Sequence, residues 1–242
     1  MNPVAPYPLR VEAEVDPRLK RWMWLVKWFL AIPHYIVLVF LWIAFWVLTL
    51  VAFFAILFTA RYPRGIFDFN VGVLRWTWRV VFYAWTVLGT DRYPPFTLKE
   101  VPDYALRVHV DHPERLSRGL VLVKWWLLAL PHYLVVAAFT GGSWGWGSDT
   151  GDGGQYEGGG SAAGAWSVSL LGVLTLIAVV VLLFTGRYPR HLFAFLMGLV
   201  RWMFRVHVYA LLMTDRYPPF RLDMGGREPE MPPETATGRP LA

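Results

Sequence analysis

RYPRGIFDFNVGVLRWTWRVVFYAWTVLGTDRYPPF, residues 61–96, sets the architecture of the chain because a second version, RYPRHLFAFLMGLVRWMFRVHVYALLMTDRYPPF, occupies residues 187–220. Both versions open with Arg-Tyr-Pro-Arg and end with Thr-Asp-Arg-Tyr-Pro-Pro-Phe, and both carry an Arg-Trp-x-x-Arg run between these ends. The chain is therefore a tandem duplication. Comparison of the flanking residues extends the copies to a first repeat, residues 7–101, and a second repeat, residues 102–223.

The composition indicates a membrane protein. Of the 242 residues, 56% are hydrophobic, whereas a soluble domain has about 45–50% apolar residues. The excess lies in continuous apolar runs, which favour a bilayer. The net charge of +6 comes from basic residues that flank those runs, an arrangement that suits anionic lipid head groups and not nucleic acid. Cysteine is absent, which excludes disulfides and thiolate metal sites.

Each repeat begins with enough apolar sequence for two membrane spans. Residues 22–60 as one helix would be about 58 Å long, roughly twice the thickness of a bilayer core. In the second repeat a glycine-rich insert, residues 140–165, separates two apolar runs and aligns with Leu41-Trp42 of the first. We therefore predict a transmembrane helical hairpin in each repeat, although Leu41-Trp42-Ile43 contains no typical turn residue. The predicted spans are about 21–41, 43–60, 119–139 and 166–186.

The charge distribution predicts the orientation of these spans. None of the 23 lysines and arginines lies in residues 140–165; they gather before the first span and after the second span of each repeat. By the positive-inside rule, both termini are cytoplasmic and the insert is an external loop. We expect a multi-pass protein of the bacterial plasma membrane. Residues 1–6 are expected to be a flexible N-terminus and residues 224–242 a disordered tail.

A third segment of each repeat, residues 67–88 and 193–213, is predicted to be an interfacial amphipathic helix. Another membrane crossing here would invert the second repeat and reverse the charge rule. Helical spacing puts Asp68, Arg75 and Arg79 on one stripe and large apolar residues on another, which is typical of a helix at the head-group boundary. Because the apolar sector is wide, partial embedding of this helix against the hairpins is an equal alternative.

Alternation of apolar and polar residues predicts short β-strands at residues 7–15 and 104–110, on the cytoplasmic side. Residues 97–101 and 221–223, which follow the two Tyr-Pro-Pro-Phe turns, are possible partners for these strands. The predicted fold is therefore mainly α and integral to the membrane. It consists of two tandem repeats, each a transmembrane hairpin plus an interfacial amphipathic helix, with short strands.

Four arginines at equivalent positions are the main candidates for a binding site: Arg75 and Arg79 in the first repeat, and Arg201 and Arg205 in the second. The i, i+4 spacing puts each pair on one helix face, where two guanidinium groups can hold a phosphate. The hypothesis is binding of anionic lipid or another anion. The alternative is that the arginines pair with carboxylates or backbone carbonyls and only position the helix.

The two Pro-His-Tyr triplets supply His34 and His132. Equivalent histidines could ligate a haem or a metal ion, but no second ligand follows at helical spacing, and the proline suggests a helix kink beside a packed histidine. We predict no metal site and no cofactor. The sequence also lacks Gly-x-Ser-x-Gly, His-Glu-x-x-His and paired intramembrane carboxylates, which argues against an enzyme.

Four motifs occur twice: Ala-x-Pro-His-Tyr, Leu-Phe-Thr-x-Arg-Tyr-Pro-Arg, Arg-Trp-x-x-Arg-Val and Thr-Asp-Arg-Tyr-Pro-Pro-Phe. In this combination the chain resembles the domain of unknown function 4389 family of bacterial membrane proteins, over most of residues 7–223. The resemblance implies a membrane location and no established activity, and it carries over no catalytic residue.

These features lead us to expect a non-enzymatic scaffold or accessory subunit. Its partners would be membrane lipids and a larger membrane complex or a homo-oligomer. One alternative is a channel or transporter built from a parallel repeat, for which residues 22–58 offer few polar groups. Another is a haem- or quinone-linked redox subunit acting through His34 and His132.

Overall fold

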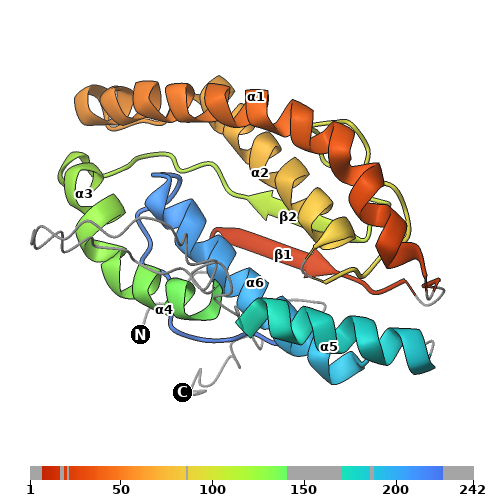
Figure 1. Ribbon diagram of the computed structural model, residues 1–242. Coiled ribbons are helices and arrows are strands. Elements are labelled where there is room, and N and C mark those ends of the chain that lie inside the picture. The colour runs from red at the N-terminus through yellow and green to blue at the C-terminus, as the bar shows by residue number, and fades with distance from the viewer. Residues whose placement is uncertain are drawn as a thin grey trace, which may run out of the picture.

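A computed structural model describes residues 7–16, 19–20, 22–85, 87–140, 170–185 and 188–225. The described chain is mainly helical and contains a two-stranded β-ribbon (Figure 1). The prediction of a mainly α fold with short β-strands is confirmed. The predicted flexible N-terminus, nearly all of the predicted external loop and most of the predicted tail lie outside the described residues.

The first outer helix, α1 (Met23–Thr59), is one continuous helix of 37 residues, so the hairpin predicted for the first repeat is wrong. The helix runs through Leu41-Trp42-Ile43, which contains no residue that favours a turn. One narrow face is buried along the whole length, at the period of a single helix. That face consists of Lys27, Ala31, His34, Leu38, Phe45, Ala52 and Ile56.

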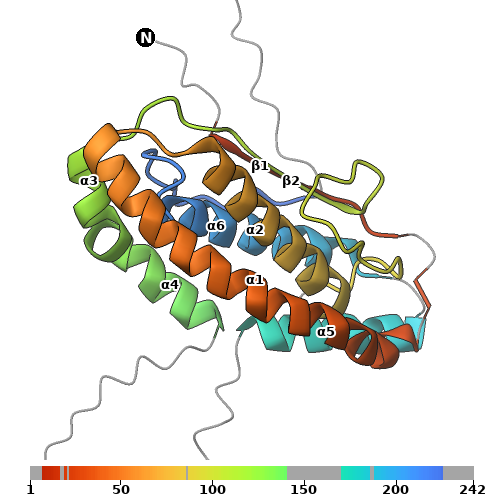
Figure 2. The same ribbon diagram turned by 90° about the horizontal axis from the view of Figure 1, so that it is seen from above.

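The second repeat has shorter helices in place of α1: α3 (Arg118–Val123), the π-helical turn η1 (Lys124–Leu128), α4 (Leu130–Thr140) and α5 (Leu170–Thr185). The first turn of α5 lies close in space to the last turn of α4 (Figure 1). The two helices point in roughly the same direction, which is opposite to that of α1 (Figure 1, Figure 2). The helices α4 and α5 are therefore not the antiparallel arms of a hairpin. The alignment of the insert with Leu41-Trp42 misled the prediction for this reason.

The ribbon consists of β1 (Leu9–Ala13) and β2 (Leu106–Val110), which pair antiparallel with Leu9 opposite Val110. Both predicted strands are confirmed, and alternate residues of each are buried. Residues 97–101 and 221–223 do not pair with them, because carbonyls in these segments accept hydrogen bonds from arginine side chains instead.

The inner helices, α2 (Arg64–Ala84) and α6 (Arg190–Ala210), have 21 residues each and start directly after a proline, whose fixed φ suits a helix start. They occupy the segments predicted as interfacial helices, but most of their side chains are buried inside the protein. This burial favours the alternative in which these helices pack against the rest of the chain, and Arg75 and Arg201 of the basic stripe donate to carbonyls of the ribbon. Trp78 and Phe204 join the two helices, with ring centroids 4.4 Å apart.

The elements form three layers (Figure 1, Figure 2). The inner helix α2 lies between α1 and β2, and α6 lies between β1 and the outer elements η1 and α5. Three helices of the described chain are long and apolar enough to cross a membrane, namely α1, the combined helix Arg118–Ala137 and α6. In the 18-residue apolar stretch of each helix, 78% of the residues of α6 are buried in the protein, compared with 22% of the residues of each of the other two helices. The outer helices therefore carry the exposed apolar surface.

Candidate functional site

Two segments, residues 87–100 and 211–225, are contacted by charged and aromatic side chains that occur in both repeats. Each follows an inner helix, contains the Thr-Asp-Arg-Tyr-Pro-Pro-Phe motif and runs back along that helix. We call them the return segments. Lysine, histidine and arginine side chains reach the return segment of their own repeat, so each contact can be compared in two copies.

A lysine of the outer helix forms an ion pair with the aspartate of each return segment. Lys27 Nζ lies 2.8 Å from Asp91 Oδ1, and Lys124 Nζ lies 2.8 Å from Asp215 Oδ1. Both lysines are buried within otherwise apolar helices. The other carboxylate oxygen accepts a hydrogen bond from a backbone N–H before the outer helix, at 2.7 Å in the first repeat and 2.5 Å in the second. Each aspartate therefore links the start of the outer helices to the return segment of its own repeat.

The two histidines pack on the phenylalanine of the same motif. The His34 ring stacks on Phe96 with 4.0 Å between ring centroids, and His132 stacks on Phe220 at 4.1 Å. Both imidazoles are fully buried. Nδ1 of His34 also accepts a hydrogen bond from the Trp76 indole N–H (3.0 Å). These contacts hold the return segments against the outer helices.

The surroundings of the histidines do not suggest a haem or metal site. The aromatic rings lie on the faces of the imidazoles, whereas a metal ion would bind a ring nitrogen in the plane of the ring; at His34, Nδ1 is already occupied by the Trp76 indole N–H. Across the described ranges, no group of three or more His, Asp and Glu side chains could hold a metal ion. Pro33 lies within α1 without ending it.

In the first repeat, the arginines predicted as an anion site donate to backbone carbonyls. Arg75 Nε donates to the Val108 carbonyl (2.9 Å), and Nη1 donates to that of Leu98 (3.3 Å). Arg79 donates to the carbonyls of Thr97 (3.1 Å) and Lys99 (2.5 Å). Burial, assisted by the neighbouring charge of Arg75, lowers the pKa of Arg79 to about 10. Its guanidinium is therefore still a cation at neutral pH.

In the second repeat Arg201 likewise donates to backbone carbonyls, whereas Arg205 forms an ion pair. Nε and Nη2 of Arg201 donate to the Val11 carbonyl at 3.0 and 2.9 Å, and Nη2 also donates to Gly225 (3.1 Å). Arg205 Nη2 lies 2.5 Å from the Asp223 carboxylate. The repeats exchange strands here, because Arg201 holds β1 of the first repeat while its counterpart in the first repeat holds β2 of the second. These bonds correspond to the positioning alternative considered from the sequence.

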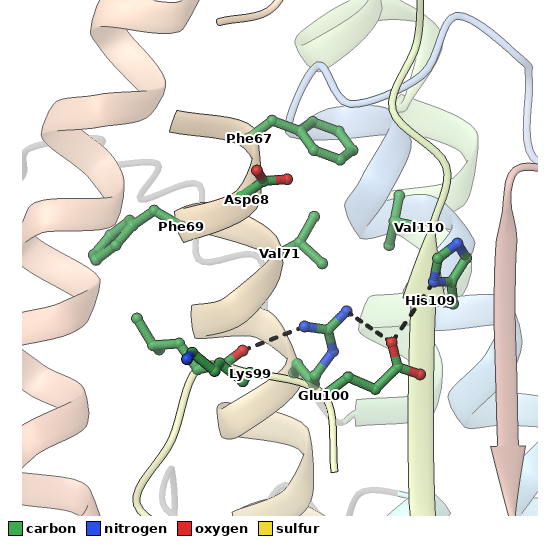
Figure 3. A pocket seen from close by; sticks show the side chains of 10 residues that line it. Phe67, Asp68, Phe69, Val71, Lys99, Glu100, His109 and Val110 are labelled. Atoms are coloured by element: carbon green, nitrogen blue, oxygen red, sulfur yellow. Dashed lines mark hydrogen bonds and ion pairs between the residues drawn. The ribbon is translucent and has the colours of Figure 1, made fainter. Parts of the chain in front are cut away.

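An open pocket of about 380 Å³ lies between α2, β2 and the first return segment (Figure 3). Arg75 Nη2 and His109 Nδ1 each lie 3.8 Å from Glu100 Oε2, and Asp68 and Lys99 add further charge to the lining. The equivalent positions around α6 and β1 carry Glu12, Ala194, Asp223 and Met224. Sequence reasoning missed this pocket because only the folded chain brings β2 and the return segment beside α2.

No curated protein and no solved structure matches the chain. A family model described as Domain of unknown function (DUF4389) matches residues 21–97 and 163–221, together more than half of the chain. The first matched segment contains Lys27, His34 and Asp91. The second contains Asp215 and the arginines of α6 but begins after Lys124. On this match the chain belongs to the domain of unknown function 4389 (DUF4389) family.

Proposed function

We propose that this protein is a non-enzymatic integral protein of the bacterial plasma membrane and acts as a scaffold or accessory subunit. One observation carries the proposal. Around most of its circumference α1 exposes large apolar side chains, among them Phe29 (74% exposed), Phe40 (68%) and Phe58 (72%). Removing one such side chain from water is worth about 1.5–3 kcal/mol. A surface of this kind requires lipid or protein to cover it.

The contacts of the duplicated polar residues support a structural role over a catalytic one. Lys27 is directed to a carboxylate of the chain itself, and Arg79 and Arg201 are directed to its carbonyls. A catalytic group has to reach a substrate, whereas these groups fix the return segments and the ribbon. We infer that the motifs maintain a rigid platform and that the outer surface meets the partner.

Anionic lipid is proposed as one partner, at exposed arginines and not at those of the inner helices. The Leu116 N–H donates to the Ala60 carbonyl (2.9 Å), and His112 Nε2 donates to the Tyr62 carbonyl (3.1 Å). These bonds join the end of α1 to the start of α3. The exposed arginines beside this junction, which we call the cationic corner, are Arg61, Arg64, Arg115 and Arg118.

The distribution of basic residues also motivates the proposed orientation. Lysine and arginine are absent from residues 140–165 and flank the apolar runs elsewhere. The positive-inside rule then puts both termini in the cytoplasm. A second copy of the chain or a larger membrane complex is the protein partner that this proposal implies.

Native purification from membranes, with mass spectrometry of bound proteins and lipids, tests the proposal. We expect the chain to stay in the membrane after alkaline carbonate treatment and to retain anionic lipid or a stoichiometric protein partner. Recovery in the soluble fraction would contradict a membrane location. Saturable ion flux through liposomes would favour a channel instead, and a visible absorption band would favour a redox subunit.

The lipid partner has a matched pair of variants. Arg61→Gln with Arg115→Gln removes two charges from the cationic corner, and Arg10→Gln with Lys99→Gln removes two exposed charges near the ribbon. We expect only the first variant to lose retained anionic lipid. Equal retention in the two variants would contradict head-group binding at the corner.

A further inference from the structure

The length and the flanking charges of α1 do not fit a single membrane crossing. At 1.5 Å per residue its 37 residues extend about 55 Å, whereas a bilayer core is about 30 Å thick. In the sequence Arg18, Lys20 and Arg21 precede the helix, and Arg61 and Arg64 follow it. The positive-inside rule favours one side of the membrane for both groups, but a single crossing would separate them.

Hydrogen bonds along α2 fix which part of α1 lies level with the ribbon. The Trp42 indole N–H donates to Thr77 Oγ1 (3.1 Å), and Asn70 Nδ2 donates to Thr49 Oγ1 (3.1 Å). Both contacts are in the central part of α1. Between them along α2, Arg75 donates to β2. The ribbon is therefore level with the middle of α1, on the opposite side of α2.

The outward face of the ribbon is charged and exposed. Arg107 Nη2 lies 3.2 Å from Glu12 Oε2, and these side chains are 40% and 41% exposed. The neighbouring side chains of His109 and Asp111 are 54% and 53% exposed. If α1 followed the bilayer normal, these groups would lie near mid-depth, where charged side chains facing lipid are strongly disfavoured.

The apolar surface continues over the second repeat. Trp125 and Trp126 on η1 are each 50% exposed, and Phe184 on α5 is 78% exposed. The row formed by α3, η1, α4 and α5 runs opposite to α1 (Figure 1, Figure 2), and in both repeats an inner helix separates the outer elements from a strand. The molecule therefore has an apolar layer of outer helices and a charged ribbon on opposite sides of its core.

We propose that the chain is inserted into the cytoplasmic leaflet, with α1 and the α3–α5 row lying along the bilayer plane and the ribbon facing the cytoplasm. The acyl chains of one leaflet cover the apolar face, and anionic head groups meet the basic ends of the outer helices. This arrangement keeps α1 continuous, leaves both of its basic ends on one side and exposes the ribbon to water. It rests on the proposed membrane location and replaces the expected crossings with a shallow insertion.

Single cysteines in the full-length chain test this arrangement, because the chain has no cysteine of its own. Lys20→Cys and Thr59→Cys report the accessibility of the two ends of α1, and Glu12→Cys reports that of the ribbon. Ile43→Cys reports the accessibility of the middle of α1, where the Ile43 side chain is 58% exposed on the protein surface. A membrane-impermeant maleimide is added to right-side-out and to inverted vesicles. We expect the first three variants to react only in inverted vesicles and Ile43→Cys to react in neither preparation.

Each other outcome overturns the arrangement in a different way. Reaction of Lys20→Cys and Thr59→Cys in opposite preparations means that α1 crosses the bilayer. Reaction of Ile43→Cys in right-side-out vesicles restores the hairpin. A Glu12→Cys variant that reacts in neither preparation means that lipid or another protein covers the ribbon.

Two controls complete the experiment. A variant is used only if its thermal unfolding in detergent matches that of the parent chain; otherwise a neighbouring exposed position replaces it, such as Phe40→Cys for Ile43→Cys. Release of the parent chain by alkaline carbonate would contradict the membrane location itself. That result separates failure of the proposed function from failure of the in-plane arrangement.

Discussion

Lys27 forms an ion pair with Asp91 inside the protein, with 2.8 Å between Nζ and Oδ1 and side chains only 2% and 13% exposed. The lysine belongs to an apolar helix, and the aspartate comes from a segment more than sixty residues later. Lys124 and Asp215 repeat the arrangement. A buried ion pair adds little net stability over a well-packed apolar pair, but loss of one partner leaves the other charge uncompensated. The fold is therefore stable only when the return segment packs against the outer helix and brings Asp91 to Lys27.

Lys27→Met should lower the free energy of unfolding by about 3–5 kcal/mol, because Asp91 is left as an unpaired charge beside an apolar helix. Lys27→Met combined with Asp91→Leu should recover much of this loss, since neither charge remains. Recovery is incomplete because Asp91 also accepts the Lys20 backbone N–H. Thermal unfolding in detergent compares the variants, and a double variant no more stable than Lys27→Met alone would contradict the explanation.

His34→Phe and His132→Phe should differ although the two histidines are equivalent in the sequence. His34→Phe leaves the Trp76 indole N–H buried without its acceptor, at a cost of about 1–3 kcal/mol. Neither ring nitrogen of His132 has a hydrogen-bond partner among the described residues, so His132→Phe removes unsatisfied polar atoms and should leave stability unchanged or raise it. Equal losses of Tm in the two variants would argue against this assignment.

The elements with a strong local signal could be predicted from sequence. Period-two alternation located both strands. Helical spacing located α2 and α6 as residues 67–88 and 193–213, within a few residues of their observed bounds Arg64–Ala84 and Arg190–Ala210. The hairpin prediction failed because the position of the insert shows only where extra sequence occurs in the second repeat. It does not reveal whether the aligned residues of the first repeat form a turn or a helix. Leu41-Trp42-Ile43 suits a helix and a bilayer equally, so composition did not distinguish a turn from a continuous helix.

Long-range contacts explain why the site was only partly predicted. Arg75 and Arg201 stood out because they recur, but their acceptors, Val108 and Val11, belong to the other repeat, and spacing along one helix does not reveal them. The partner of Lys27 was missed although a signal existed. A lysine in an apolar run needs a counter-charge, and Asp91 recurs in the second repeat just as the lysine does.

Tyr62→Phe should reduce the loss of stability in alkali. Burial raises the pKa of Tyr62 to about 12 from its ordinary value of 10.0, against the opposing effect of its hydrogen bond with Asn70. Above about pH 10 the unfolded chain releases this proton while the folded chain retains it, so the stabilisation present below that pH is lost as the pH rises to about 12. The variant lacks this part of the decline, although loss of the Asn70 hydrogen bond lowers its stability at every pH.

Denaturant unfolding between about pH 9 and about pH 12 measures how steeply the free energy of unfolding falls with pH in the parent chain and in Tyr62→Phe. Tyr217→Phe, at an exposed tyrosine, is the matched control and should follow the parent chain. Parallel curves for Tyr62→Phe and the parent across this window would mean that the Tyr62 hydroxyl is not buried in the folded protein.

Gly72→Ala and Gly198→Ala test how closely the return segments approach the inner helices. A Cβ at Gly72 would lie 2.8 Å from Leu98 Cβ and 3.0 Å from the Leu98 carbonyl oxygen, whereas a Cβ at Gly198 would lie 3.3 Å from Met224 Cγ. The methionine side chain can move aside, but relief at Gly72 requires movement of the backbone. Within a helix, alanine is favoured over glycine by about 1 kcal/mol. Gly198→Ala should therefore keep or raise Tm, and Gly72→Ala should lower it and increase proteolysis near Leu98. A Gly72→Ala variant as stable as the parent would mean that the first return segment does not pack on α2.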